Sequence, residues 1–110
     1  MVKQGDIIQV SFDPQIGHEQ AGYRPALVVS SNAFNEICSV KIVCPISDRT
    51  KDFPLHVPLD HRTITTGVIL CQHIRSLDLT ERPYQYIEHM PEDILDRVLR
   101  IIRAEISFEE

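Results

Sequence analysis

Tryptophan is absent from this 110-residue sequence, glycine is scarce with four residues, and cysteine occurs three times. No apolar run approaches the roughly 18 residues that a membrane-spanning helix needs. The N-terminal stretch has too short an apolar segment, and no cleavage pattern, for a signal peptide. An odd number of cysteines without a C-x-x-C pair argues against a disulfide framework and for a reducing compartment. We therefore expect a cytoplasmic protein with one domain over residues 1–110.

Common functional motifs are also missing. The sequence has no Gly-rich phosphate-binding loop, no H-x-x-x-H metal motif, no G-x-S-x-G nucleophile elbow and no dinucleotide fingerprint. Cys71 and His73 would share one face of a strand, but two ligands are too few for a metal site. Cys44 and Cys71 lie in apolar runs, which indicates small core residues. We therefore expect neither a metal nor a cofactor.

The formal net charge of −5 counts against nucleic-acid binding if it is taken alone. Acidic residues gather near the C-terminus, whereas the stretch 41–75 is richer in basic ones. Its cations are Lys41, Arg49, Lys51, Arg62 and Arg75, against Asp48, Asp52 and Asp60. A locally basic face on an acidic protein is therefore one arrangement that the sequence allows.

Alternating or continuous apolar runs predict a protein built mainly of β-strands. Residues 5–12 alternate like a half-buried strand, and 25–31 are apolar enough for burial on both faces. Further strands are expected at 39–46, stopped at Pro45, at 54–60 as an edge strand marked by Pro58, at 67–78 as one long strand, and at 84–89.

Successive residues of the long strand 67–78 would point to opposite faces of the sheet. Gln72 would share a face with Val68, and His73 would share the other face with Arg75. At most one of Gln72 and His73 would therefore face a given pocket.

The end of the sequence predicts a helix of about 14 residues with an apolar stripe. Pro91, Glu92 and Asp93 suit its start, because proline fits the first turn and acidic side chains favour the positive end of the helix dipole. A single helical turn is expected at 33–36. The predicted fold class is mainly β: a small curled sheet or barrel of five or six strands with a C-terminal amphipathic helix packed on it.

A small set of polar residues has one coherent chemical use, the cleavage of RNA without a metal. The RNA 2′-OH is the nucleophile, so the enzyme supplies a proton acceptor, a proton donor for the leaving oxygen, and donors for the charge on phosphorus. Arginine suits the last task, and histidine suits proton transfer near neutral pH. The candidates are His18, Arg24, Ser47, Gln72, His73 and Arg75.

Each candidate also has a plainer interpretation. From its position alone, Arg24 at a strand entrance is more typical of a surface ion-pair partner. His18 in a Gly-containing loop is more often simply solvated, and Ser47 after a strand is typical of a turn. Arg75 would then only balance the charge of Asp78.

Several further motifs occur together along the chain. Residues 5–14 follow the pattern G-D-[IVL]…V-x-[FL]-[DS]-P, and residues 17–25 follow G-[HS]-E-Q-x-G-x-R-P. The segments VCPIS at 43–47, KDFP at 51–54, TGV at 66–68 and IRSLD at 74–78 complete the set. Nearly from end to end, the chain resembles the MazF/PemK (Kid) family of toxins from bacterial toxin–antitoxin pairs.

The resemblance implies an SH3-like barrel of five to seven mostly antiparallel strands, and a homodimer. It also implies a sequence-specific, metal-independent endoribonuclease that cuts single-stranded mRNA and halts translation. The products would carry a 2′,3′-cyclic phosphate and a 5′-hydroxyl. A cognate antitoxin, similar to MazE or PemI, would block the site.

The same resemblance suggests roles for individual residues. Arg24 matches the family's catalytic arginine, which shuttles protons or stabilises charge on phosphorus. Ser47 stands where the family usually has threonine and keeps a hydroxyl to hold a phosphate oxygen. His18 matches a histidine that some PemK-like members place near the scissile phosphate. The expected RNA-binding residues are Gln20, Arg49, Lys51, Gln72, His73 and Arg75.

Two positions depart from the family pattern. His73 replaces a glutamine, and Gln72 replaces an acid proposed as the base in PemK-like members, so a carboxylate base at position 72 is excluded. Two alternative functions stay open. One is a gyrase poison like CcdB, whose family uses a C-terminal tryptophan that this chain lacks, and the other is a catalytically silent interaction module.

Overall fold

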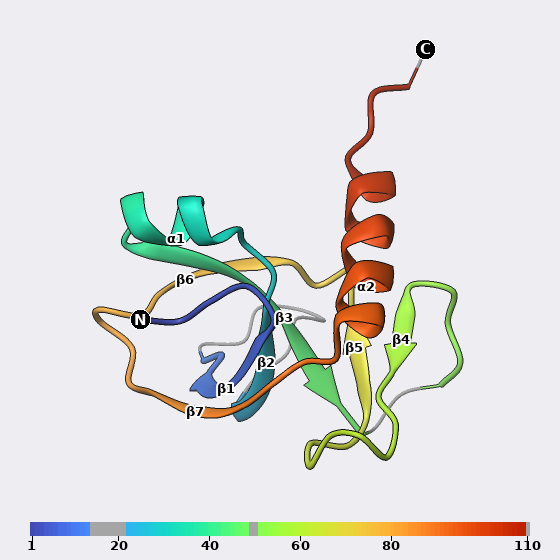
Figure 1. The fold of residues 1–110 in the computed structure, drawn as a ribbon, viewed down its shortest axis with the longest axis horizontal. Helices are drawn as coiled ribbons and strands as arrows, with labels where there is room; N and C mark the ends of the chain where they lie inside the picture. The colour runs from blue at the N-terminus through green and yellow to red at the C-terminus, as the bar shows by residue number, and fades with distance from the viewer. Residues whose placement is uncertain (14–21, 49–50, 110) are drawn as a thin grey trace.

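The computed structural model describes residues 1–13, 22–48 and 51–109 (Figure 1). Within them the chain forms seven strands and two helices. In order they are β1 (Asp6–Ser11), β2 (Tyr23–Val28), α1 (Asn32–Ile37), β3 (Val40–Ser47), β4 (His56–Pro58), β5 (Val68–Leu70), β6 (Arg75–Asp78), β7 (Tyr84–His89) and α2 (Glu92–Glu105). No helix of this described part is both long and apolar enough to cross a membrane.

The strands form an antiparallel sheet in the order β4-β5-β3-β2-β1-β7, with β6 also paired to β3. β3 is the longest strand, with eight residues, and it organises the sheet. β2 pairs along one side of β3, while β6 and β5 follow one another along the other side. The predicted fold class, mainly β with a C-terminal helix, is confirmed, and the described strands form an open sheet.

The single strand expected over 67–78 is wrong. β5 and β6 are separate strands, and the segment between them turns where the His73 N–H donates to the Leu70 carbonyl (3.1 Å). Both strands pair with β3, but the register shifts by three residues from β5 to β6. The turn accommodates this three-residue shift. It contains Gln72 and His73, which therefore do not alternate within a strand.

The predicted stop of β3 at Pro45 is also wrong, because the strand continues to Ser47. The Val29 N–H donates to Ile42 across the β2–β3 pair, and such hydrogen-bonded pairs alternate with non-hydrogen-bonded ones. By this alternation Pro45, which is paired with Ala26, is in a non-hydrogen-bonded pair. Its missing backbone N–H therefore costs no hydrogen bond to β2. On the other side of β3, Pro45 lies between the residues paired with β6 and those paired with β5. Proline is tolerated in such a gap.

The remaining elements follow the expectations closely. β4 is the edge strand marked by proline, and β1 and β7 occupy the expected segments. β2 begins at Tyr23, earlier than expected, because it pairs there with Ser11 of β1. α1 begins after Ser31, whose hydroxyl accepts a hydrogen bond from the Phe34 N–H (3.1 Å). α2 has the predicted 14 residues.

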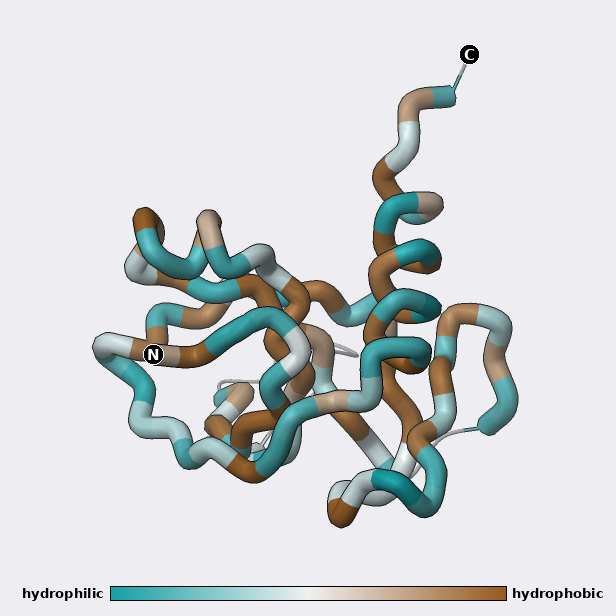
Figure 2. The backbone as a smooth tube through the Cα atoms, viewed as in Figure 1, coloured by the Kyte–Doolittle hydropathy of each residue, from teal (hydrophilic) through white to brown (hydrophobic). Residues whose placement is uncertain are grey.

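Two apolar clusters occupy the two faces of the sheet. One lies beneath α2 and joins Ile94 and Val98 of the helix to Leu27 and Ile69 of the strands. Hydrophobic residues recur along α2 between hydrophilic ones, as the predicted apolar stripe requires (Figure 2). The other cluster contains Ile8, Val10, Phe12, Ala26, Val28, Val43 and Leu77. We call the face that carries this second cluster, whose residues are also buried, the second face.

Cys44 and Cys71 are fully buried in the cluster beneath α2, as predicted for small core residues. Burial raises the pKa of the Cys71 thiol to about 12, and burial likewise raises the pKa of Cys44. Both thiols are therefore protonated at neutral pH and act as small apolar groups.

Candidate functional site

Arg24 and Ser47 are brought together at the end of the β2–β3 pair. The register pairs Ala26 with Pro45, and Arg24 and Ser47 each lie two residues beyond this last pair on their strands. Residues two apart on a strand point to the same face, so Arg24 shares the face of Ala26 and Ser47 that of its partner Pro45. The paired ladder ends at Ala26, and beyond it a pocket of about 300 Å³ opens. Its lining residues are Gly22, Tyr23, Arg24, Pro25, Ile46, Ser47, Asp48 and Thr66.

The loop before β5 closes one side of this pocket, which we call the Arg24–Ser47 pocket. Gly67 has a φ of +115°, and a Cβ built there would lie 2.6 Å from the Ser47 carbonyl oxygen. The hydroxyl of the preceding Thr66 donates to Asp48 Oδ1 (3.1 Å). Only glycine fits this close approach of two backbones, so Gly67 sets the position of Ser47.

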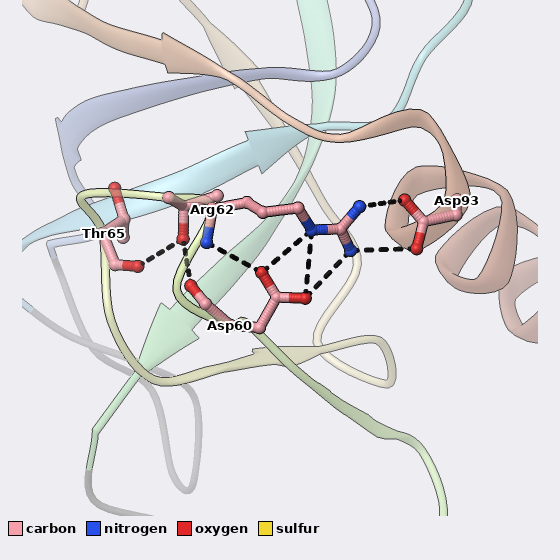
Figure 3. A network of polar contacts seen from close by, with 5 residues as sticks. Asp60, Arg62, Thr65 and Asp93 are labelled. Atoms are coloured by element: carbon pink, nitrogen blue, oxygen red, sulfur yellow. Dashed lines mark hydrogen bonds and ion pairs between the residues drawn. The ribbon is translucent and has the colours of Figure 1, made fainter.

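Arg62 anchors this loop to the helix (Figure 3). Its guanidinium is 2.9 Å from Asp60 Oδ2 and 2.8 Å from Asp93 Oδ1 at the start of α2. The hydrogen bond from Arg62 lowers the pKa of Asp60 to about 2, and it also lowers the pKa of Asp93. Both carboxylates therefore stay ionised throughout the physiological range, and the loop is held at its outer end.

Glu88 of β7 anchors the same loop nearer the pocket. Its carboxylate accepts hydrogen bonds from the N–H groups of Ile64 (3.1 Å) and Thr65 (2.8 Å) and from the Thr65 hydroxyl (2.8 Å). Partial burial raises the pKa of Glu88, but these hydrogen bonds more than offset it, so the net pKa is lowered. Asp93, through Arg62, and Glu88 thus hold the backbone that leads to Thr66 and Gly67.

Arg75 lies on the second face, together with Ser47. It pairs with Val43 of β3, while Val68 of β5 pairs with Ser47, and Val43 and Ser47 share one face of their strand. The long-strand prediction placed Arg75 and Val68 on opposite faces, and it is wrong because the three-residue shift exchanges the faces. The shift therefore turns Arg75 toward the pocket side of the sheet.

Arg75 is also fixed by contacts with Phe12, the residue that follows β1. Its Nη1 donates to the Phe12 carbonyl (2.9 Å), and its guanidinium carbon lies 5.9 Å from the centre of the Phe12 ring. The described residues contain no ion pair between Arg75 and Asp78. Asp78 instead accepts hydrogen bonds from Thr80, which lower its pKa. Pairing with Asp78 is thus not the role of Arg75.

The structure describes three of the other predicted site residues, and three lie outside the described part of the chain. Lys51 is exposed beside a second pocket, and the Gln72 amide nitrogen is 3.0 Å from Nε2 of His56. His73 is half-buried in the turn between β5 and β6. His18, Gln20 and Arg49 lie outside the described residues.

The basic face expected from residues 41–75 forms only in part. Lys41 is buried, and its Nζ donates to the Cys38 carbonyl. Arg62 is held between two carboxylates. Of the described cations in that stretch, Lys51 and Arg75 remain on the side of the candidate site.

Several residues of the site were not predicted. Asp48 and Thr66 line the Arg24–Ser47 pocket, and Phe53 and His56 line the second pocket. The T-G-V motif at 66–68 was the signal that marked the loop beside Ser47. Nothing in the sequence pairs His56 with Gln72, because the turn that sets their distance depends on the sheet register.

Comparisons with known proteins show the family of this chain. The family model for the PemK-like, MazF-like toxin of type II toxin–antitoxin systems matches residues 3–106. The chain belongs to this family. Endoribonuclease PemK of Escherichia coli is 39% identical over 104 residues, covering 89% of this chain and 77% of PemK. Endoribonuclease EndoA of Bacillus subtilis is 32% identical over 116 residues, covering 98% and 99%.

Solved structures of toxins share the fold. The crystal structure of MazF (Form-I) from Deinococcus radiodurans superposes with a TM-score of 0.90 at 34% identity, covering 97% of both chains. The MazE-MazF structure (Form-II) from the same organism gives 0.84 at 34% identity, covering 98% of this chain and 97% of that chain. The endoribonuclease names of the relatives favour an RNA-cleaving toxin over the gyrase poison and the silent module.

Proposed function

We propose that this endoribonuclease toxin cuts single-stranded mRNA in the Arg24–Ser47 pocket, without a metal. The observation that carries the proposal is that Arg24 and Ser47, at the end of the β2–β3 pair, line one pocket of about 300 Å³. A guanidinium presents a planar set of N–H donors that matches phosphate oxygens, and it stays charged at all physiological pH values.

The chemistry needs only groups that this chain supplies. The ribose 2′-OH attacks phosphorus and loses its proton, the bond to the 5′-oxygen breaks, and that oxygen gains a proton. The products are a 2′,3′-cyclic phosphate and a 5′-hydroxyl. Arg24 donates hydrogen bonds to the phosphoryl oxygens as charge develops on them, and the Ser47 hydroxyl donates to one of these oxygens. His18 is the residue we assign to proton transfer, since position 72 carries an amide.

The same proposal extends to partners and location. Solved relatives include MazE–MazF complexes, so we assign this toxin a cognate antitoxin that covers the Arg24–Ser47 pocket. We further propose that residues 1–110 act as one SH3-like toxin domain, assemble as a homodimer and work in the cytoplasm, where mRNA is found.

Cleavage assays test the proposed chemistry. We expect the purified protein to cut single-stranded RNA at the same rate with and without EDTA. We expect no cleavage when a 2′-deoxynucleotide replaces the ribose at the cut site, because the nucleophile is then missing. The 5′ product should end in a cyclic phosphate. Loss of activity in EDTA, or cleavage of the 2′-deoxy substrate, contradicts the mechanism.

A further inference from the structure

A second pocket, of about 410 Å³, lies beside the Arg24–Ser47 pocket. The two are linked through Val68, which lines the second pocket and pairs with Ser47 on one side and with Pro58 on the other. Paired strands lie less than 5 Å apart, so the second pocket begins about one strand spacing from the Ser47 backbone. A nucleotide next to a phosphate held at Ser47 is therefore within reach of it.

An aromatic pair, exposed Phe53 and half-buried His56, lines this second pocket. The rings of Phe53 and His56 have their centres 5.1 Å apart at an angle of 53°. The His56 N–H donates to the Phe53 carbonyl (3.0 Å), which fixes the backbone between the two rings. Phe53 is nevertheless 49% exposed, although burial of an aromatic ring is favourable. The ring thus offers an open apolar surface beside a phosphate-binding pocket.

His56 is held in one tautomer by two contacts. Nδ1 lies 3.3 Å from the Lys51 carbonyl, which only accepts, so Nδ1 carries the proton. Nε2 of the neutral ring then accepts from the amide nitrogen of Gln72 at 3.0 Å. This contact orients the Gln72 amide, which keeps one carbonyl oxygen and a further N–H for other partners. An oriented amide with both a donor and an acceptor matches the edge of a nucleobase.

We infer that Phe53, His56 and Gln72 form a binding subsite for one nucleobase of the RNA, adjacent to the scissile phosphate. The inference rests on the proposed ribonuclease function and adds a specificity site to it. The base stacks on Phe53, and the Gln72 amide, oriented by His56, hydrogen-bonds to its edge. Unpaired bases are the usual targets of such aromatic and amide groups, because their faces and edges are free.

Cleavage of a randomised single-stranded RNA pool tests this subsite. We expect Phe53→Ala to raise KM by about tenfold with little change in kcat. Stacking stabilises the bound substrate and the transition state equally, so its loss weakens binding without slowing the chemical step. Phe53→Tyr should restore the wild-type KM. Gln72→Leu should weaken the base preference at one position beside the cut and leave the other positions unchanged. Phe108→Ala is the matched control, because Phe108 is 90% exposed and lies beyond α2.

The inference is overturned if Phe53→Ala keeps the wild-type KM and base preference, or if Phe108→Ala changes them as much. A binding measurement separates the subsite from the ribonuclease function itself. Titration with a non-cleavable 2′-O-methyl RNA should shift the ring proton signals of Phe53 and His56 in NMR spectra, whether or not the protein cuts RNA. Unshifted Phe53 and His56 signals in the presence of bound RNA would exclude the subsite even for an active enzyme.

Discussion

Replacement of Arg24 by alanine is expected to lower the kcat of RNA cleavage about 100- to 1,000-fold, the usual cost of removing a preorganised donor to a developing negative charge. Arg24 is half-buried at the edge of the Arg24–Ser47 pocket, and the sheet register directs it to the same face as Ser47. Arg24→Lys should recover little of the activity, because an ammonium cannot contact two phosphoryl oxygens in the same planar geometry.

The matched control for this change is Arg100→Ala. Arg100 lies on the exposed side of α2, where its guanidinium contacts Asp96 one helical turn away (2.8 Å). Single-turnover cleavage and circular dichroism of the three variants should show an unchanged fold in all of them and full activity in Arg100→Ala. Wild-type activity in folded Arg24→Ala would remove Arg24 from the mechanism.

Replacement of Gly67 by alanine is expected to destabilise the fold by about 3 kcal/mol, from the strain of positive φ and from overpacking against rigid backbone. The new Cβ would lie 2.6 Å from the carbonyl oxygen and 2.9 Å from the carbonyl carbon of Ser47. These atoms belong to β3, which pairs here with β5, so neither strand moves without the other. Cleavage should also fall, because the displaced backbone carries the Ser47 hydroxyl.

Gly22→Ala separates the cost of positive φ from the cost of overpacking. Gly22 also has a positive φ of +80°, but an added Cβ there meets nothing within 4 Å. Its cost should therefore be the backbone strain alone, about 1 kcal/mol. Urea unfolding of both variants gives the comparison. Equal losses of stability in Gly67→Ala and Gly22→Ala would show that the contact with Ser47 does not constrain the loop.

Local sequence signals predicted the elements whose structure depends on neighbouring residues. α2 is the clearest case, because a proline, two acidic residues and apolar residues at helical spacing are all local features of the chain. The edge strand β4 was likewise marked by Pro58. These signals required no knowledge of which strands pair.

Features that depend on pairing between distant segments were not predictable in the same way. The alternation in residues 67–78 suits one strand, and only the shifted pairing of β5 and β6 with β3 explains the turn between them. The juxtaposition of Arg24 and Ser47 has the same origin, since it follows from a β2–β3 register set by tertiary packing. Residue chemistry made both residues candidates and family resemblance suggested their roles, but only the fold shows that they line one pocket.

The departure at position 72 has a structural counterpart that no local signal indicated. Gln72 replaces an acid, and the amide that results contacts His56 in the described structure. An ionised carboxylate only accepts, so it would contact Nε2 of His56 only when that nitrogen carries a proton, whereas the amide donates to an unprotonated Nε2. The change therefore removes a potential base and creates an oriented hydrogen-bonding group beside Phe53.

The structure of the protein bound to an RNA with 2′-deoxyribose at the cut site is the most direct test of the central claim. The scissile phosphate should lie in the Arg24–Ser47 pocket, with its non-bridging oxygens within hydrogen-bonding distance of the Arg24 guanidinium and of Ser47 Oγ. A scissile phosphate bound away from both groups, or an RNA lying across α2 on the covered face of the sheet, would contradict the account.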